Sequence, residues 1–380
     1  MTEHSRLAPS SAARRVACPG SRALEEKYPE TVESPYAREG HAAHWVAAEM
    51  LRGNPTDESF PLGMEVTDEM IEGAEMYTDY IRKIIKDMSK EKDIRFVHDD
   101  LYIERRIDIK RIHPDCWGTP DAWFCLSDEL HIFDYKYGHG YIEVFENWQL
   151  IEYAAGILDL LNVNGIDDRR LNVTLHIVQP RNFHRLGPIR SWRMKASDLR
   201  PYFNILETAE AEAMQDTAVC RPNPECNYCL GRHACEALQR STLSVIDVAE
   251  LNTPFDLSPA SLGNELRYLR RAAELLDARI TGLEEQATST IKRGQRVPFF
   301  KLESNPGSKR WKVPNEEIKA LGELLGHDLT KPVQVITPTQ AIKAGVPEEL
   351  VKQYVEVKSG ALKLELDNGD NARKIFSKGE

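Results

Sequence analysis

Apolar and polar positions alternate along the central stretch from Gly118 to Tyr153, which reads GTPDAWFCLSDELHIFDYKYGHGYIEVFENWQLIEY. Two apolar segments are separated there by turn-forming residues at 127–129. Short apolar runs that flank a polar turn are typical of a β-hairpin. The pattern therefore predicts two antiparallel strands in the middle of the chain.

Three charged residues lie at the ends of this hairpin. Asp121 adjoins the first apolar segment, and Asp134 and Lys136 flank Tyr135 at the end of the second. Because strand side chains alternate, Asp134 and Lys136 share a face and Tyr135 points away. Two carboxylates can hold a hard divalent cation such as Mg²⁺, while an ammonium orients water or stabilises phosphate charge. A phosphodiester-hydrolysing site is one interpretation, and a solvated hairpin is the alternative.

Helical periodicity occurs on both sides of the hairpin. Apolar residues recur at helical spacing over 66–90, which predicts an amphipathic helix that packs on a core. The segment from Phe96 to Ile107 alternates like a strand, on which Glu104 could reach the active face, and Leu171 to Val178 predicts a further strand. Shorter helices are expected over residues 9–18, 38–51 and 196–214. The predicted fold class is mixed α/β, of the α+β type.

A heptad pattern follows residue 240. Its apolar positions alternate in steps of four and three and predict a helix of about 30 residues. They are Leu262, Leu266, Leu269, Ala273, Leu276, Ile280, Leu283 and Ala287. An intramolecular partner is the first expectation for this stripe, and self-association through 262–287 is the alternative.

Length and composition limit the function classes. A chain of 380 residues is expected to hold two domains, and 41% apolar with 29% charged residues is typical of a globular protein. No apolar segment is long enough to cross a bilayer and no signal-peptide h-region begins the chain, so we expect an intracellular protein without membrane partners. A net charge of −11 argues against nonspecific coating of nucleic acid. Nothing resembles a P-loop, so an ATP-driven motor is excluded.

Seven cysteines argue against a disulfide framework, because their number is odd. Cys226, Cys229 and Cys235 form a C-x2-C-x5-C pattern, and Cys18 stands alone near the start. Four such thiolates could bind zinc or an iron–sulfur cluster, and the spacing does not separate the two. Cys220 is a spare that could replace one of the four.

Cationic residues gather between residues 181 and 195, interleaved with Phe183 and Trp192. Guanidinium groups that hold phosphates, next to rings on which bases stack, are typical of a groove that follows a nucleic-acid strand. The candidate binding residues are Arg181, Arg185, Arg190 and Arg193. Solvated surface charge is the alternative.

Pro120 and Asp121, followed by Asp134, Tyr135 and Lys136, resemble the signature of the PD-(D/E)XK nucleases. Two further patterns resemble the RecB-like branch of that superfamily, namely Gly40 and His44 as G-x-x-x-H, and Gln149 and Tyr153 as Q-x-x-x-Y. The resemblance implies a restriction-endonuclease-like core, a mixed sheet flanked by helices. It implies that Asp121, Asp134, His44 and the Tyr135 carbonyl bind Mg²⁺ or Mn²⁺, that Lys136 serves the attacking water, and that Gln149 and Tyr153 orient DNA. His41 is the competing histidine.

The cysteine arrangement is similar to that of the AddB-type and CRISPR-associated RecB-like exonucleases. It implies a [4Fe–4S] cluster on Cys18, Cys226, Cys229 and Cys235, with zinc as the alternative. The whole chain resembles phage and prophage proteins that join such a nuclease to a C-terminal tail. The implied domains are a nuclease domain over 1–240, a long helix over 241–295 and a small α+β module over 296–380.

The sequence thus predicts a metal-dependent DNA exonuclease that acts on linear single- or double-stranded DNA in the bacterial host cytoplasm. A phage recombination protein or a helicase would be its partner. The alternative is a protein with an inactive nuclease fold, stabilised by zinc or an iron–sulfur cluster, that binds DNA or serves as a scaffold.

Overall fold

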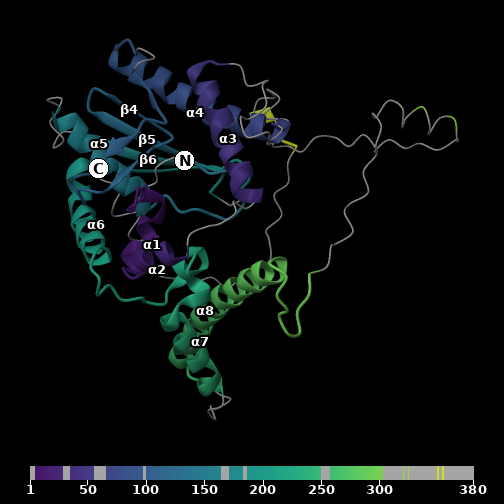
Figure 1. The fold of residues 1–380 in the computed structure, drawn as a ribbon. Coiled ribbons are helices and arrows are strands. Elements are labelled where there is room, and N and C mark those ends of the chain that lie inside the picture. The colour runs from purple at the N-terminus through teal and green to yellow at the C-terminus, as the bar shows by residue number, and fades with distance from the viewer. Residues whose placement is uncertain are drawn as a thin grey trace. The chain divides into compact units, whose positions relative to one another are not determined.

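A five-stranded mixed sheet organises the chain in the computed structural model (Figure 1). The structure describes residues 5–28, 35–54, 66–96, 100–163, 171–182, 186–249 and 257–302, together with residues 320, 324, 349, 350, 353 and 354. The strand order is β1-β4-β5-β6-β7. The strands of this sheet are β1 (Tyr102–Ile103), β4 (Ala122–Leu126), β5 (Glu129–Tyr135), β6 (Asn172–Val178) and β7 (Ile189–Lys195).

The predicted hairpin forms the centre of this sheet. β4 pairs with β5 in antiparallel register, and Ser127 takes a φ of 59° in the turn between them. β5 then pairs in parallel with β6. Parallel neighbours need a crossover connection, and helix α5 (Trp148–Val163) supplies it. Both the hairpin and the strand expected over 171–178 are confirmed.

Helices cover both faces of the sheet, which gives three layers (Figure 1). Alternate residues of β5 divide between them: Phe133 and Tyr135 pack on the layer of α3 (Pro35–Arg52) and α4 (Asp68–Lys92), while Ile132 faces α5. The helix α6 (Arg200–Ala213) packs beside α5, after the 3₁₀ turn η4 (Ala196–Leu199). Burial of each large apolar side chain contributes about 1.5–3 kcal/mol. The predicted mixed α/β class is confirmed.

The segment from Phe96 to Ile107 differs from its prediction. β1 has two residues, and β2 (Ile107–Asp108) pairs with β3 (Trp117–Gly118) in a separate two-stranded sheet. Between β1 and β2 the backbone of Glu104 takes a φ of 47°. A left-handed residue cannot continue a strand. One continuous strand was therefore the wrong expectation.

Short N-terminal helices pack against a cysteine-rich segment more than two hundred residues later. The N-terminal elements are η1 (Pro9–Ser11), α1 (Ala12–Ala17) and α2 (Ser21–Lys27). The cysteine-rich elements are η5 (Pro224–Tyr228) and η6 (Arg232–Ala234). Two helices follow, α7 (Glu236–Ala249) and α8 (Pro259–Lys292). α1 contacts α5, α6 and η5, so it joins the layer on one face of the sheet to the cysteine segment.

A long helix over the heptad residues is confirmed as α8, although it begins at Pro259 and residues 241–249 belong to α7. Its buried face is not the predicted stripe. Leu275, Ala278 and Gly282 of α8 are buried, and Gly282 lies so close to Arg232 that a Cβ there would approach Arg232 Cγ to 2.7 Å. The stripe residues Leu262, Leu269, Ile280 and Leu283 are 42–56% exposed. An intramolecular partner for the whole stripe is therefore wrong for the described residues, and self-association stays a prediction.

The chain divides into two compact units. One comprises Met1–Arg293 with Asn368–Glu380, and the other comprises Gly294–Asp367. Beyond residue 302 the predicted C-terminal module lies outside the described residues, apart from six isolated positions. Among the described helices, none has the length and apolar character to cross a membrane.

Candidate functional site

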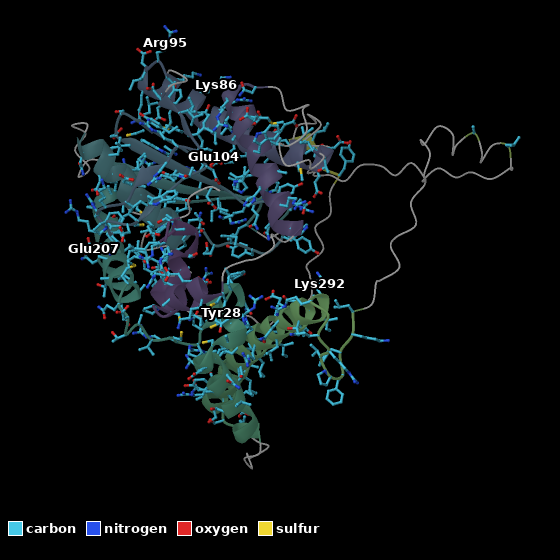
Figure 2. All side chains as sticks on the ribbon, viewed as in Figure 1. Tyr28, Lys86, Arg95, Glu104, Glu207 and Lys292 are labelled. Carbon is cyan, nitrogen blue, oxygen red and sulfur yellow. The ribbon has the colours of Figure 1, made fainter. Side chains whose placement is uncertain are left out.

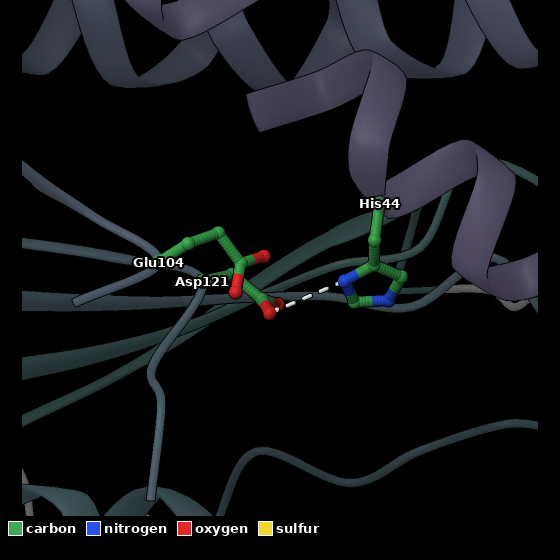
Figure 3. A group of neighbouring side chains, drawn as sticks. All are labelled: His44, Glu104 and Asp121. Atoms are coloured by element: carbon green, nitrogen blue, oxygen red, sulfur yellow. Dashed lines mark hydrogen bonds and ion pairs between the residues drawn. The ribbon is translucent and has the colours of Figure 1, made fainter. Parts of the chain in front are cut away.

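Three side chains from separate elements meet at one end of the sheet (Figure 3). His44 comes from the middle of α3, Glu104 follows β1, and Asp121 precedes β4. One ligand atom from each lies within 4.8 Å of the others, and His44 Nδ1 is 3.2 Å from Asp121 Oδ1. His44 therefore faces the site, whereas the competing His41 lies on the exposed side of α3.

Backbone contacts hold Asp121 in place. Its Oδ2 accepts a 2.6 Å hydrogen bond from the Tyr135 backbone N–H, and its carbonyl accepts a 3.0 Å bond from the Glu104 N–H. The Tyr135 ring is buried between Tyr77 and His44, at 5.0 Å and 5.4 Å between centroids, so it lies on the other face of β5 from Asp134, as strand alternation predicts, and packs against His44. The main chain of Tyr135 thus borders the site while its side chain belongs to the core.

A second group adjoins these residues at the end of β5. Lys136 Nζ lies 3.0 Å from Asp134 Oδ1 and 3.0 Å from Gln149 Oε1 on α5. The Gln149 amide nitrogen donates to the Tyr153 hydroxyl at 3.5 Å, and that hydroxyl donates to the Thr119 carbonyl at 3.1 Å. Gln149 and Tyr153 thus link Lys136 to the loop that carries Asp121.

Gly118 permits the close packing of that loop. A Cβ at Gly118 would lie 2.7 Å from Pro9 and 2.8 Å from Tyr153, closer than carbon atoms approach without overlap. The N-terminal segment therefore supports the loop directly.

Burial sets the charge states of the acidic groups. Desolvation, reinforced by Asp121, raises the pKa of Glu104 to about 7, and desolvation raises the pKa of Asp134 to about 6 although Lys136 opposes it. Burial would also raise the pKa of Asp121, but the neighbouring His44 holds it below its ordinary value. Desolvation disfavours the charged form of Lys136, and the attraction of Asp134 and Asp121 outweighs it and raises the Lys136 pKa. The site therefore concentrates negative charge that a cation would neutralise.

One carboxylate oxygen beside these residues has no hydrogen-bond partner among the described residues. This atom is Oδ2 of Asp134, and it is buried. A buried carboxylate oxygen left unpaired is costly, and a metal ion is one of the few groups that satisfy it. The close group itself holds two carboxylates and one imidazole, from Asp121, Glu104 and His44, and Asp134 lies outside it, next to Lys136. Such a donor set fits a divalent cation with oxygen preference. Sequence reasoning placed Glu104 only as a supporting residue, because its contact with Asp121 depends on the left-handed backbone.

A separate pocket gathers the sulfur atoms of five cysteines from the N-terminal helices and the cysteine-rich segment. Its lining includes Cys18, Cys220, Cys226, Cys229 and Cys235. Leu24 and Leu238 also line it, and so do the cationic residues Arg14, Arg221 and Arg232. The four predicted ligands therefore lie together, and Cys220 lies with them.

Backbone N–H groups donate to three of the sulfurs. Arg221 N lies 3.2 Å from Cys18 Sγ, and Asn223 N and Leu238 N lie 3.4 Å from the sulfurs of Cys226 and Cys235 respectively. Such bonds stabilise thiolate charge. A hydrogen bond from Cys220 lowers the pKa of Cys18 to about 7 and that of Cys235 to about 6, whereas burial raises the pKa of Cys229 to about 12. Thiolates held in this way are suited to a metal that takes four cysteine ligands.

Three of the four predicted arginines lie among the described residues, and each has partners within the protein. Arg181 pairs with Glu39 at 3.1 Å and with Glu69 at 3.0 Å, and Arg193 pairs with Glu129 at 2.5 Å. Arg190 is 5% exposed and donates to Gln179 Oε1 at 2.7 Å.

Arg190 is therefore a structural residue, which corrects its assignment to a binding groove. Trp192, expected to stack on bases, is buried against Phe145 at 5.0 Å between ring centroids. Phe183 and Arg185 lie outside the described residues.

Comparison with solved structures finds a protein described as "Crystal structure of SSO0001", with 15% sequence identity and a TM-score of 0.30. The alignment covers 62% of this chain and 89% of that one. The family model described as "Protein of unknown function (DUF2800)" matches residues 4–369. With nearly its whole length matched, the chain belongs to the DUF2800 family.

Proposed function

We propose that this protein is a metal-dependent DNA exonuclease that hydrolyses phosphodiester bonds by the PD-(D/E)XK mechanism. The observation that carries the proposal is the convergence of His44, Asp121 and Glu104 within 4.8 Å, next to the Asp134–Lys136 pair. Asp134 and Lys136 at the end of β5 are about ninety residues away from His44 in the sequence, and the fold brings them to the same site. The specific assignment to exonucleases acting on linear DNA rests on the RecB-like motifs described above.

Asp121, Asp134, Glu104 and His44 would hold the cation, together with the Tyr135 carbonyl. The bound ion would supply charge neutralisation at the scissile phosphate and lower the pKa of a coordinated water. Mg²⁺ binds almost exclusively oxygen, whereas an imidazole is more readily accepted by Mn²⁺. Mn²⁺ is therefore the first ion to test.

Lys136 would act on the reacting groups. Its contacts with Asp134 and Gln149 fix the ammonium at the edge of the carboxylate group, where it can orient the attacking water and stabilise the charge on the phosphate. Gln149 and Tyr153 would act as positioning residues, because they connect Lys136 to the carbonyl of Thr119, two residues before Asp121. This role adds to the DNA contacts that the family resemblance implies for them.

The thiol pocket would hold a [4Fe–4S] cluster, with zinc as the alternative. Three backbone N–H···S bonds and the apolar lining support a buried centre of thiolate ligands. Cys18 would connect the N-terminal helices to the cysteine-rich segment through this centre. Its role would be structural, since the proposed hydrolysis transfers no electrons.

The proposed setting is a phage-derived nuclease in the bacterial cytoplasm that works in DNA recombination, repair or degradation. The sequence contains no P-loop, so translocation along DNA would come from a separate helicase or recombination partner.

The test is digestion of end-labelled DNA by the purified protein with Mn²⁺, comparing single with double strands and linear with circular molecules. Asp134→Asn and Lys136→Met should each reduce the cleavage rate by about 100-fold or more. Glu207→Gln and Lys86→Met are matched controls, since both residues are exposed on the surface (Figure 2). They should cleave at the rate of the parent protein.

Equal cleavage by Asp134→Asn, Lys136→Met and the parent would refute the site. A parent protein that binds linear DNA but cleaves none with Mn²⁺ or Mg²⁺ would instead support a scaffold built on an inactive nuclease fold. Linear and circular DNA degraded at equal rates would exclude an exonuclease.

A further inference from the structure

Cys220 lies in the thiol pocket as a fifth sulfur, although four thiolates complete either a tetrahedral zinc site or a [4Fe–4S] cluster. Cys220 and Cys18 lie on neighbouring segments in space. The Gly20 N–H donates to the Val219 carbonyl at 3.2 Å, and the Arg221 N–H donates to Cys18 Sγ at 3.2 Å. These two bonds hold residues on both sides of Cys220 against the end of α1.

Gly20 makes this approach possible. A Cβ at position 20 would lie 2.5 Å from Cys220 N and 2.9 Å from Cys220 Sγ, so any other residue would push the segment away. Cys220 lines the pocket together with Cys18 and Cys235. Cys220 also packs against the cluster of buried residues that contains Cys226 and Cys235. Its place in the pocket is thus built by the fold.

The spacing of the cysteines also makes Cys220 a candidate for the fourth ligand. Residues 220–235 alone read C-x5-C-x2-C-x5-C, which is four thiols within one short segment. The set that includes Cys18 needs a residue from the other end of the domain. Two complete sets of four therefore exist, and they share Cys226, Cys229 and Cys235.

We propose that the five thiols serve four ligand positions, with Cys18 and Cys220 as alternative donors to the same position. With Cys18 as ligand, the metal centre joins α1 to the cysteine-rich segment. With Cys220 as ligand, residues 220–235 keep the metal while α1 is released from it. The inference rests on the metal centre of the proposed function and is independent of DNA hydrolysis.

The test measures the metal content of the full-length protein, purified without oxygen, as iron, sulfide and zinc per chain. Cys18→Ser and Cys220→Ser should each retain about half or more of the parent's metal, because the other thiol takes the open position. The Cys18→Ser/Cys220→Ser double variant should retain about a tenth or less, as should Cys226→Ser. Cys125→Ser is the matched control, since Cys125 lies on β4 outside the pocket. This variant should retain as much metal as the parent protein.

The proposal is overturned if Cys18→Ser alone loses as much metal as Cys226→Ser, or if the double variant retains it. A second measurement uses the unmodified protein and so does not depend on the folding of variants. Alkylation of the metal-loaded chain, followed by mass spectrometry, should divide its label between Cys18 and Cys220 and leave Cys226, Cys229 and Cys235 protected. Label on Cys220 alone would show a fixed ligand set and overturn the exchange.

These outcomes distinguish failure of the ligand exchange from failure of the proposed nuclease activity. A parent protein without metal in the pocket removes both the cluster and the exchange. A metal-loaded parent that follows the expected pattern but cleaves no DNA leaves the exchange standing and removes the hydrolysis.

Discussion

The guanidinium of Arg15 on α1 lies 2.5 Å from the carboxylate of Glu210 on α6, inside the protein and across 195 residues of sequence. Arg15 also reaches Glu152 on α5 at 3.4 Å, and the Cys116 thiol donates to Glu152 at 3.1 Å. Glu152 is next to Tyr153, and Arg15 is three residues before Cys18. This buried network therefore connects the helix at the thiol pocket to the helix that borders the metal site.

Removing Arg15 should strongly destabilise the protein. Arg15→Met leaves the buried Glu210 carboxylate without its cation, and loss of one partner of a buried ion pair costs about 3–5 kcal/mol. The free energy of unfolding, measured by urea titration, should fall by that amount. Arg240→Met is the control, because Arg240 and its partner Glu236 are more than 80% exposed, and such pairs contribute little. Equal losses in the two variants would show that the Arg15 network does not stabilise the fold.

Glu104 should contribute to cation affinity. Glu104→Gln removes one negative charge from the group with His44 and Asp121, so the dissociation constant for Mn²⁺ should rise by about 10–100-fold. Calorimetric titration of the protein with Mn²⁺ would measure it, with Glu207→Gln as the control. Unchanged Mn²⁺ affinity would exclude Glu104 from the ligands.

The same group predicts how cation affinity depends on pH. Carboxylates must be deprotonated to bind a metal, and burial raises the pKa of Glu104 to about 7 and that of Asp134 to about 6. Protons therefore compete with Mn²⁺ as the pH falls through this range. Affinity should decrease steadily between about pH 8 and pH 6, and the decrease should be smaller in Glu104→Gln.

The strand pattern was sufficient to predict the hairpin and the proximity of Asp134 to Lys136, because strand alternation is set by local geometry. It could not predict Glu104, whose position depends on a single left-handed residue after a two-residue strand. The spacing of the cysteines likewise could not show that Gly20 lets Cys220 approach Cys18. Contacts of this kind depend on the tertiary fold.

The buried face of the long helix α8 is a second feature that the sequence pattern could not predict. Its heptad pattern predicted the helix correctly, but the face that packs is decided by the close approach of Gly282 to Arg232 and not by the apolar stripe. A small residue that allows close contact can therefore decide which face of a helix is buried, even where another face carries a row of larger apolar residues.

Substitutions on the two faces of α8 should have different effects. Leu275 is 6% exposed and packs in the cluster with Cys226 and Leu238, so Leu275→Ala should reduce the free energy of unfolding by about 2–5 kcal/mol. Leu269 is 53% exposed, and Leu269→Ala should leave it nearly unchanged. Urea unfolding of both variants measures this. If Leu269→Ala is the more damaging variant and its loss depends on protein concentration, the stripe is buried between copies of the chain.

Gln149 should affect the chemical step more than DNA binding. Gln149→Leu removes the amide oxygen that accepts from Lys136 at 3.0 Å, so the ammonium keeps Asp134 but loses its second contact. Loss of this positioning should reduce the single-turnover cleavage rate by about 10–100-fold. The dissociation constant for DNA, measured in Ca²⁺ to prevent cleavage, should rise by a smaller factor than the cleavage rate falls. Gln286→Leu on the exposed side of α8 is the control, and a weaker DNA affinity with unchanged cleavage would assign Gln149 to binding instead.

Two histidines in the sheet should make the stability of the fold depend on pH. His131 Nδ1 on β5 lies 2.9 Å from His176 Nε2 on β6, and His176 Nδ1 lies 3.0 Å from the Tyr80 hydroxyl on α4. Both imidazoles are buried and stack with Phe133 and Phe124. Burial lowers the pKa of His131 to about 4 and lowers the pKa of His176 well below its ordinary value. Both histidines are therefore neutral in the folded protein at neutral pH.

The sign of the effect follows from these shifts. In the unfolded chain a histidine binds its proton near pH 6.5, so below that value the unfolded state takes up protons that the folded state does not. Stability is complete above about pH 6.5 and decreases as the pH falls toward 4, and His131 alone should cost on the order of 2 kcal/mol at pH 5. Urea unfolding of the parent at about pH 7.5 and pH 5 measures the loss. His131→Phe/His176→Phe keeps the aromatic stack without the titration, so its stability should decrease less over the same interval, and an equal decrease would assign the acid sensitivity to other groups.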